Sequence, residues 1–346
     1  MRIGSVRHMR AVVYRKPGPS SVLTLVEREL PEPGPGEVRI RLVRAGVNPT
    51  DWKFRTATMN GHDEVTPGQD GAGVVDAVGP DVAGFGVGDR VWTMLAQHGR
   101  AHGTAAEYTV QPVENVVHLP GEASYDLGAS LGVPAVTAHR ALTCAFGGPR
   151  RLGPGALAGR TVLVAGGAGA VGHAAIQLAR WSDATVITTV SSAEKAALAR
   201  AAGAHHAVDY TAGDTAARIL AIAPDGVDHV VEVAPAVNVE LDIEVLKVHG
   251  TLAIYANNGG EDMTVPLRAA FSKNLRFQFI ILYTLDRGLL AAAAEDVYAA
   301  AEVGALRVGE DAGLAVHHFA LEEAAAAHDA VQDGLVGKAL LDIAAD

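Results

Sequence analysis

The chain has 346 residues, which is long enough for two domains of roughly 100–200 residues each. Hydrophobic residues make up 49% of it and charged residues 19%, so the composition favours packed domains and argues against a disordered chain. The formal net charge of -11 argues against broad binding to nucleic acid or to an anionic membrane, since both need a basic surface.

Two further features bear on location. No apolar run reaches the ~18 residues of a transmembrane helix, and the basic N-terminal stretch has no apolar core typical of a signal peptide. Cys144 is the single cysteine, so neither an intramolecular disulfide nor a thiolate zinc cluster can form. We therefore expect a cytoplasmic protein that does not contact a membrane.

From residue 9 to about 120, short apolar runs are interrupted by glycine and proline, as in "MRAVVYRKPG", "GEVRIRLVRAG" and "GVGDRVW". Runs of this length with turn residues between them are typical of β-strands. Residues 1–8 are interpreted as an extension before a strand that starts near Met9. This part of the chain predicts a β-rich domain.

From about residue 135 to 283, apolar strands alternate with amphipathic helices, as in "TVLVA", "VGHAAIQLAR", "TVITTV" and "SAEKAALARAAG". This alternation predicts right-handed βαβ units and a doubly wound parallel sheet. The tail after residue 286 predicts a long helix, a strand, another helix and a last strand, "GKALLDI", that returns to the first domain. We therefore predict an α/β protein with a β-rich domain at residues 9–134 and 284–346 and a parallel-sheet domain at residues 135–283.

The stretch "AGGAGAVG" directly follows the strand "TVLVA" and directly precedes a helix. Its glycines at 167, 169 and 172 have the G-x-G-x-x-G spacing of a dinucleotide-binding turn. The backbone of this turn and the helix N-terminus are expected to hold a pyrophosphate. The residues predicted to do so are Gly166, Gly167, Gly169, Ala170, Val171 and Gly172. The alternative is an ordinary glycine-rich turn between a strand and a helix.

The next strand ends in "ITTVSSAEK", where an acidic residue would bind a ribose 2′-hydroxyl. Ser191 and Ser192 stand there instead, with Lys195 close behind. Hydroxyls, helix amides and a lysine favour a 2′-phosphate, so the stretch predicts NADPH rather than NADH. The alternative is a capping box from Ser191 to Glu194 with Lys195 in solvent, and the two interpretations are compatible.

Several stretches resemble the medium-chain dehydrogenase/reductase superfamily, and specifically its zinc-free quinone oxidoreductase and zeta-crystallin branch. They are "GVNPTD", "PGQDGAGVVDAVG", "LGVPAVTAHRAL", "AGGAGAVG" and "GLVGKALL", and the resemblance runs from about residue 9 to 343. It implies a GroES-like catalytic domain and a Rossmann domain. Zinc-dependent relatives carry a cysteine near Asn48 and Gly-His-Glu where this chain has Gly68-Gln69-Asp70. The resemblance therefore implies no metal site.

The same resemblance assigns catalytic roles in "GVNPTDWKFR". Asn48 matches the family's active-site asparagine, which lies beside the nicotinamide ribose and the substrate, and its amide is expected to point into a cleft. Lys53 stands where quinone reductases usually have tyrosine. The related enone and alkenal reductases also have a lysine at this place. Lys53 could donate to the carbonyl oxygen that gains charge during hydride transfer, or be a helix-surface lysine paired with an acid. Thr50 or Asp51 is expected to cap the helix.

Four further residues are assigned to cofactor binding, three by resemblance and Asn257 by its place in the loop "YANNGG" after a predicted strand. Thr137 matches a threonine near the nicotinamide end, and Tyr210 matches a tyrosine that approaches the 2′-phosphate in relatives. Asn257 could meet the nicotinamide ribose, and Lys338 matches the Gly-Lys of the family's last strand. Cys144 is expected to be buried and inert.

The stretch "NLRFQFIILYT", residues 274–284, is strongly β-prone and would leave an exposed sheet edge in a monomer. Such an edge can pair with its symmetry mate, so we predict a homodimer joined there.

Together these features predict an NADPH-dependent oxidoreductase that transfers hydride to a small electrophile, either a quinone or an activated enone, without zinc. Two alternatives remain open at this point. One is an enone, alkenal or enoyl-thioester reductase. The other, from a different class, is an NADPH-binding structural or redox-sensor protein with little turnover.

Overall fold

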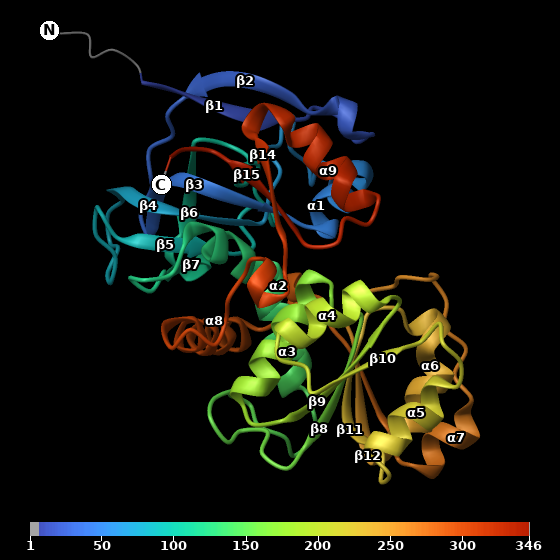
Figure 1. The fold of residues 1–346 in the computed structure, drawn as a ribbon. Helices are drawn as coiled ribbons and strands as arrows, with labels where there is room; N and C mark the ends of the chain where they lie inside the picture. Colours follow the sequence, from blue (N-terminus) through green and yellow to red (C-terminus); the bar gives the residue numbers. More distant parts are fainter. Residues whose placement is uncertain (1–6, 346) are drawn as a thin grey trace, which may run out of the picture. The chain divides into compact units, whose positions relative to one another are not determined.

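The structure is a computed structural model that describes residues 7–345, so the first six residues of the expected N-terminal extension lie outside it. The chain divides into two compact units, Met1–Val133 with Ala315–Asp346 and Pro134–Leu314. Figure 1 shows strands dominating the first unit and a helix-flanked sheet in the second. In the described part of the chain, no helix is long and apolar enough to cross a membrane.

The first unit is built on a seven-stranded sheet with the order β14-β15-β3-β4-β5-β7, and β6 also pairs with β3. Its strands are β3 (Glu37–Val47), β4 (Asp70–Val78), β5 (Arg90–Thr93), β6 (Tyr108–Pro112), β7 (Val116–His118), β14 (Val316–Ala320) and β15 (Lys338–Asp342). A separate hairpin joins β1 (His8–Val13) and β2 (Thr24–Glu29). Ala339 of β15 pairs antiparallel with Val47 of β3, which confirms the predicted return of the last strand.

Helices of the first unit are α1 (Pro49–Ala57), which directly follows β3, and α9 (Ala324–Gln332). The division between the units falls within α2 (Tyr125–Thr143). The core of the first unit is formed by alternate side chains of the strands and by one face of α9. It includes Val38, Ile40, Leu42, Val75, Val91, Leu321, Ala327 and Leu341.

The second unit contains a six-stranded sheet with the order β10-β9-β8-β11-β12-β13, and every pairing in it is parallel. Its strands are β8 (Thr161–Ala165), β9 (Thr185–Val190), β10 (His206–Asp209), β11 (Val227–Glu232), β12 (Leu246–Ile254) and β13 (Arg276–Phe279). The chain starts in the middle, runs to one edge, returns and runs to the other. This is the strand order of doubly wound dinucleotide-binding folds, so the predicted fold class is confirmed.

Helices cover both faces of this sheet, α3 and α4 on one face and α5, α6 and α7 on the other (Figure 1). They are α3 (Ala170–Trp181), α4 (Ala193–Ala201), α5 (Thr215–Ile222), α6 (Pro235–Val245), α7 (Leu267–Ser272) and α8 (Arg287–Glu302). Val162, Leu163 and Val164 of the central strand are at most 1% exposed. A strand covered on both faces needs a continuous apolar run, which is why "TVLVA" does not alternate.

The predicted boundary at residue 284 differs from the division in the structure, because α8 belongs to the second unit. Asp296 of α8 is buried and accepts hydrogen bonds from His139 Nε2 at 2.8 Å, Leu152 N at 2.7 Å and Arg151 Nε at 2.7 Å. All three donors lie in the second unit. The carboxylate thus anchors α8 there, and this signal is invisible in the helical pattern of the tail.

The β-prone stretch 274–284 forms a shorter strand than predicted. Only Arg276–Phe279 is a strand, β13, and a short 3-10 turn follows at Leu282–Thr284. Among the described strands β13 pairs with β12 alone, so it lies at an edge of the sheet. Phe279 and Ile281 beside that edge are 64% and 57% exposed.

Candidate active site

The glycine-rich turn joins β8, which ends at Ala165, to α3, which begins at Ala170. Gly166 has a φ of +68°, a backbone conformation that residues with a Cβ rarely adopt. Gly169 is the N-cap residue of α3, and no side chain caps its N–H groups. An uncapped helix N-terminus after a tight turn presents backbone donors and a positive dipole end to an anion.

The three glycines of the G-x-G-x-x-G pattern have different reasons to lack a side chain. A Cβ at Gly167 would lie 2.2 Å from Thr188 Oγ1, and one at Gly172 would lie 2.4 Å from the carbonyl oxygen of Gly166. A Cβ at Gly169 would meet only that same oxygen, at 3.5 Å. Two glycines are therefore required by packing, while the third leaves open space in front of the first turn of α3. The space and the donors fit the pyrophosphate of a dinucleotide.

The end of β9 carries the serines predicted to bind a 2′-phosphate. Ser192 is the N-cap of α4 and accepts from Lys195 N at 3.2 Å, while Lys195 Nζ donates to Ser191 Oγ at 2.9 Å. The predicted capping box from Ser191 to Glu194 is wrong by one residue, because the helix begins at Ala193. The helix is capped, and Ser191 and Lys195 form one polar group at the carboxyl end of the strand.

Two other predicted cofactor residues lie on loops at the carboxyl ends of strands in the second unit. Tyr210 is 53% exposed, and its N–H donates to the carbonyl of Val190 at 3.0 Å, which places it beside the end of β9. Asn257 follows β12, and its Nδ2 donates to Glu261 Oε1 at 2.8 Å. Thr137 is buried on α2, whose residues from Pro134 onward belong to this unit.

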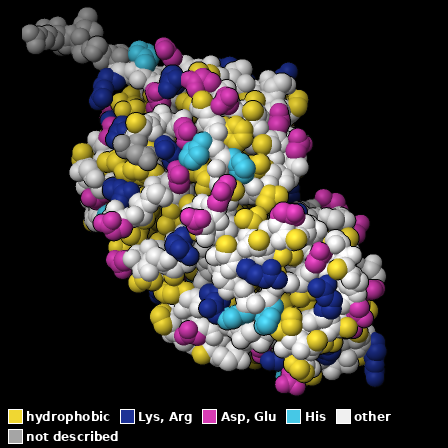
Figure 2. Space-filling view, in the orientation of Figure 1, with side chains coloured by type: hydrophobic (Ala, Val, Ile, Leu, Met, Phe, Trp, Pro, Cys, Tyr) yellow, Lys and Arg dark blue, Asp and Glu magenta, His cyan; other side chains and the backbone are white. Residues whose placement is uncertain are grey.

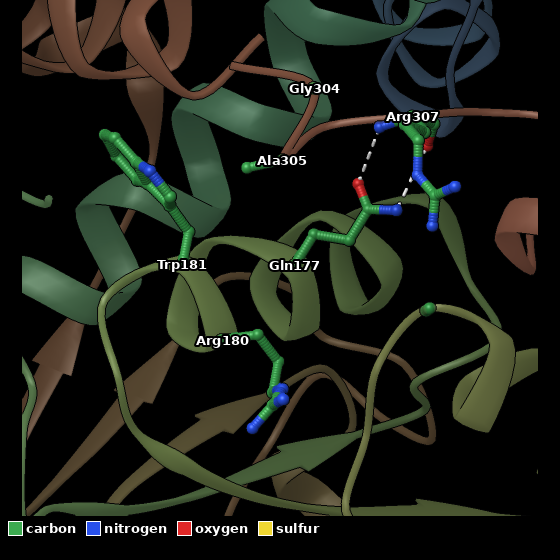
Figure 3. Close-up of a pocket in the computed structure, with 7 residues that line it drawn as sticks. Gln177, Arg180, Trp181, Gly304, Ala305 and Arg307 are labelled. Carbon is green, nitrogen blue, oxygen red and sulfur yellow. Dashed lines mark hydrogen bonds between the residues drawn. The ribbon is translucent and has the colours of Figure 1, made fainter. Parts of the chain in front are cut away.

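The second unit also contains a depression of about 340 Å³ at the C-terminal half of α3. Figure 3 shows Gln177 reaching from α3 to the backbone of Arg307. The Gln177 amide accepts from Arg307 N at 3.0 Å and donates to Arg307 O at 3.2 Å. This depression is lined by Gln177, Arg180, Trp181, Ala202, Gly304, Ala305 and Arg307, none of which belongs to the glycine turn. Its polar contacts pin the chain after α8 to α3.

In the first unit, Asn48 lies where β3 passes into α1. Its backbone is extended, with φ −125° and ψ 160°, as expected for a residue before a proline, and Pro49 opens the helix. Asn48 itself is the N-cap residue, rather than the predicted Thr50 or Asp51. Asp51 contributes in the reverse direction, because its Oδ2 accepts from Asn48 N at 2.7 Å.

The Asn48 side chain is held at both ends. Its Nδ2 donates to Asp70 Oδ2 at 2.7 Å, and its Oδ1 accepts from Lys338 Nζ at 2.6 Å. Lys338 Nζ also donates to the carbonyl of Val47 at 3.3 Å and lies 3.9 Å from Asp70 Oδ2. All three side chains are at most 2% exposed. Both ends of the amide thus contact other side chains, and Lys338, predicted to bind the cofactor, contacts Asn48.

Burial dominates the electrostatics of this network. It raises the pKa of Asp51 to about 7, with a further contribution from the charge of Asp70. Burial also raises the pKa of Asp70, against the opposing effects of Lys338 and of the Asn48 and Val133 N–H groups. It lowers the pKa of Lys338, against the attraction of Asp70 and Asp51. One cation thus faces two carboxyl groups, and burial raises the pKa of both.

Lys53, the other predicted catalytic residue, is exposed on α1. Its ammonium nitrogen lies 5.8 Å from the centre of the Trp52 ring. The cation that contacts Asn48 is thus Lys338. Sequence reasoning missed Asp70, although an acid at the start of the apolar run "GAGVV" was a usable signal. Cys144 is buried as expected, and burial raises its pKa to about 11.

Comparisons with known proteins agree with this architecture. Residues 34–121 match a family described as "Alcohol dehydrogenase GroES-like domain", and residues 170–299 match one described as "Zinc-binding dehydrogenase". A quinone oxidoreductase of Lama guanicoe is 31% identical over 97% of this chain and 98% of its own length. A 2-haloacrylate reductase of a Burkholderia species is 30% identical over 92% of this chain and 94% of its own.

Among solved structures, a mycobacterial protein complexed with NADPH is similar, with a TM-score of 0.80 and 28% identity over 96% of this chain and 99% of its own. The chain therefore belongs to the medium-chain dehydrogenase/reductase superfamily, in its quinone oxidoreductase branch, and is an oxidoreductase that uses a nicotinamide cofactor. The predicted family is thus confirmed. Within residues 7–345, no three His, Cys, Asp or Glu side chains are grouped to hold a metal ion.

Proposed function

We propose that this protein is an NADPH-dependent reductase that transfers hydride to a quinone or an activated enone. The observation that carries the proposal is the glycine turn, whose open Gly169 face and uncapped α3 N-terminus fit a dinucleotide pyrophosphate. When bound, the cofactor supplies the hydride from its nicotinamide ring. A solvent proton then completes the reduction of the substrate.

The preference for NADPH rests on the end of β9. Ser191 and Lys195 form a polar group there, in the place where an acid would select NADH. Lys195 lies in the first turn of α4, whose N-cap is Ser192, and Tyr210 lies beside the same strand end. A carboxylate at this point would repel a 2′-phosphate, whereas hydroxyl and ammonium donors bind it.

Asn48 is proposed to act on the substrate as a hydrogen-bond donor. The carbonyl oxygen gains negative charge when hydride reaches the electrophilic carbon, and a fixed donor stabilises that charge. Loss of one such donor typically costs on the order of 3 kcal/mol in the barrier. Lys53 is proposed as a second donor from the exposed face of α1, and Thr137, Asn257 and the turn backbone as cofactor contacts.

The electrophile remains open between a quinone and an activated enone. Quinone oxidoreductases are among the similar proteins, and so is a 2-haloacrylate reductase. Lys53 in place of the tyrosine usual in quinone reductases favours the enone. We give the two substrates equal weight in the test.

Oxidation of NADPH and of NADH should be followed with 1,4-quinones, alkyl enones and a crotonyl thioester. We expect turnover with quinones or enones and a clear preference for NADPH. Turnover of the thioester alone would assign an enoyl-thioester reductase instead. Tight NADPH binding without turnover of any compound would contradict the enzymatic proposal and favour an NADPH sensor.

We also propose that two copies pair along β13. The strand lies at a sheet edge, and the exposed Phe279 and Ile281 beside it offer apolar surface for a second copy. A dimer in sedimentation at micromolar concentration that dissociates on Phe279→Asp would support this proposal. A monomeric wild-type protein would contradict it.

On the face drawn in Figure 2, basic side chains are scattered among acidic ones, which gives a nucleic acid no basic patch to bind there.

A further inference from the structure

The buried side-chain amide of Asn48 contacts two charged side chains of the first unit, and the three residues lie on or beside three different strands. Asp70 is the first residue of β4, Lys338 is the first residue of β15, and Asn48 follows the last residue of β3. β3 lies between β15 and β4 in the sheet, so the register of both neighbours brings these positions together. Gly46 pairs with Asp70 on one side and with Leu340 on the other.

The chemistry of the two partners fixes which way the amide points. A carboxylate only accepts hydrogen bonds and an ammonium only donates them, whereas an amide has a donating and an accepting end. Nδ2 of Asn48 must therefore face Asp70, and Oδ1 must face Lys338. A flipped amide would set two donors against each other and two acceptors against each other. The network thus leaves one Nδ2 proton of Asn48 that neither partner uses.

The backbone around the network is shaped to admit both charged groups. Asp70 Oδ1 accepts from Val133 N at 2.8 Å, and a Cβ at Gly132 would lie 2.1 Å from the same oxygen. A Cβ at Gly46 would lie 3.0 Å from Lys338 Nζ and 2.2 Å from the carbonyl oxygen of Ala129. Two glycines thus leave room for the two charged side chains.

A buried ion pair is a poor way to stabilise a core, because desolvation of the charges offsets much of their attraction. Apolar side chains of similar size would usually be as stable. A pair that bonds both ends of a single amide does something that apolar residues cannot do, since it selects one of the two amide orientations. Conflict between stability and local chemistry is expected where a residue serves function.

We propose that Asp70 and Lys338 are positioning residues that lock the Asn48 amide with its remaining Nδ2 N–H presented to the reacting carbonyl oxygen of the substrate. This inference rests on the proposed reductase function. It assigns Lys338 to Asn48 rather than to the cofactor. It also gives Asp70 a role in catalysis through Asn48, without contact to the substrate.

A swap of the two groups separates this role from a structural one. In Asp70→Asn, the new amide cannot accept from both Asn48 Nδ2 and Val133 N, so we expect lower stability and lower kcat. In the double variant Asn48→Asp/Asp70→Asn, the amide at position 70 accepts from Val133 N and donates to the carboxylate at position 48, which Lys338 still contacts. Every side-chain hydrogen bond of the network is restored and its net charge is unchanged, but the side chain at position 48 no longer offers an N–H.

We therefore expect the double variant to regain the melting temperature and the NADPH affinity of the wild type, while kcat stays on the order of 100-fold lower. Double-variant turnover equal to the wild type would overturn the inference, because a purely structural network would be repaired by the swap. If the double variant does not regain stability, the test instead compares Lys338→Arg with Lys338→Met. The arginine restores a donor to Asn48 Oδ1 and should return kcat towards the wild type, and equal kcat in the two variants would overturn the inference.

If the wild type turns over none of the compounds, the proposed function is wrong and kcat cannot test the positioning role. A second experiment therefore tests this role without turnover. The side-chain amide protons of Asn48 can be observed by NMR and assigned with the Asn48→Asp variant. With NADP⁺ and 1,4-naphthoquinone bound, one of the two Nδ2 protons should shift, while the one bonded to Asp70 stays in place. If neither proton responds to the ligands, the positioning role is wrong whatever the enzyme's activity.

Discussion

The glycine turn of the second unit and the Asn48 network of the first are built in opposite ways. The turn uses backbone N–H groups and the absence of side chains, and its Gly169 face is open. The network uses charged side chains, and all of them are buried. Backbone donors need no charge and little desolvation to bind an anion, whereas a charged pair can impose one orientation on an amide. The backbone geometry of the turn thus suits an anion, whereas the charges of the network orient the Asn48 amide.

The strongest test of this contrast removes the cation of the network. Lys338→Met shortens the side chain by one atom and leaves Asp70 without its compensating charge, so we expect a loss of about 3–5 kcal/mol in the free energy of unfolding. Urea denaturation measures it. Lys247→Met is the matched control, because Lys247 pairs with Asp228 at 3.0 Å but is partly exposed. Its loss should stay below about 1 kcal/mol, and equal losses would show that burial is not decisive.

The protonation of Asp51 provides a pH-dependent test. Its pKa is about 7 in the folded protein and near 4 in an unfolded chain. Between these values the folded state holds a proton that the unfolded state has lost, so this group's contribution to stability falls as pH rises from about 4 to about 7. Asp51→Asn removes that slope. Its stability relative to the wild type should improve by a few kcal/mol across this window, and a constant difference between the two proteins would contradict the assignment.

Two alanine substitutions compare the packed and open glycines of the turn. Gly172→Ala places a methyl group against the carbonyl of Gly166, so both stability and NADPH affinity should fall, the former by about 1–3 kcal/mol. Gly169→Ala has room for its methyl group and should keep the melting temperature. It should nevertheless weaken NADPH binding about 10-fold, because the methyl group fills the space in front of α3. Fluorescence titration with NADPH checks both, and unchanged affinity in Gly169→Ala would place the pyrophosphate elsewhere.

The smallest effect is expected at the end of β9. Lys195→Ala removes the ammonium group that bonds Ser191, so the ratio of NADPH to NADH efficiency should fall about 5-fold. The ratio of kcat/KM for the two cofactors measures it. Because the group is close to the surface, added salt should reduce the difference. A ratio that does not change would mean that Lys195 serves only the α4 cap.

The sequence was sufficient for features that depend on local pattern. The alternation of strand and helix predicts the parallel sheet, and the glycine spacing predicts the turn at Gly167, because both signals lie within about 20 residues. The return of the last strand also follows from its apolar run. The strand pattern at residues 338–342 is local, although its pairing with β3 joins residues far apart in the chain.

Features that depend on distant residues were missed. Asp70 and Lys338 lie 22 and 290 positions from Asn48, and no local pattern indicates that their side chains meet. The membership of α8 in the second unit depends on Asp296, which is 157 positions from His139. The cap of α4 was missed by one residue, because either of two adjacent serines has the chemistry of a cap. Tertiary hydrogen bonds between buried polar groups decide these points.

The central claim is that the protein reduces an electrophile with NADPH and that Asn48 supports the hydride transfer. Stopped-flow oxidation of bound NADPH by the best quinone or enone, compared between the wild type and Asn48→Ala, tests it most directly. We expect unchanged NADPH affinity and a single-turnover rate about 100-fold lower in the variant. Equal rates in the two proteins, or no oxidation by the wild type with any quinone or enone, would contradict the account.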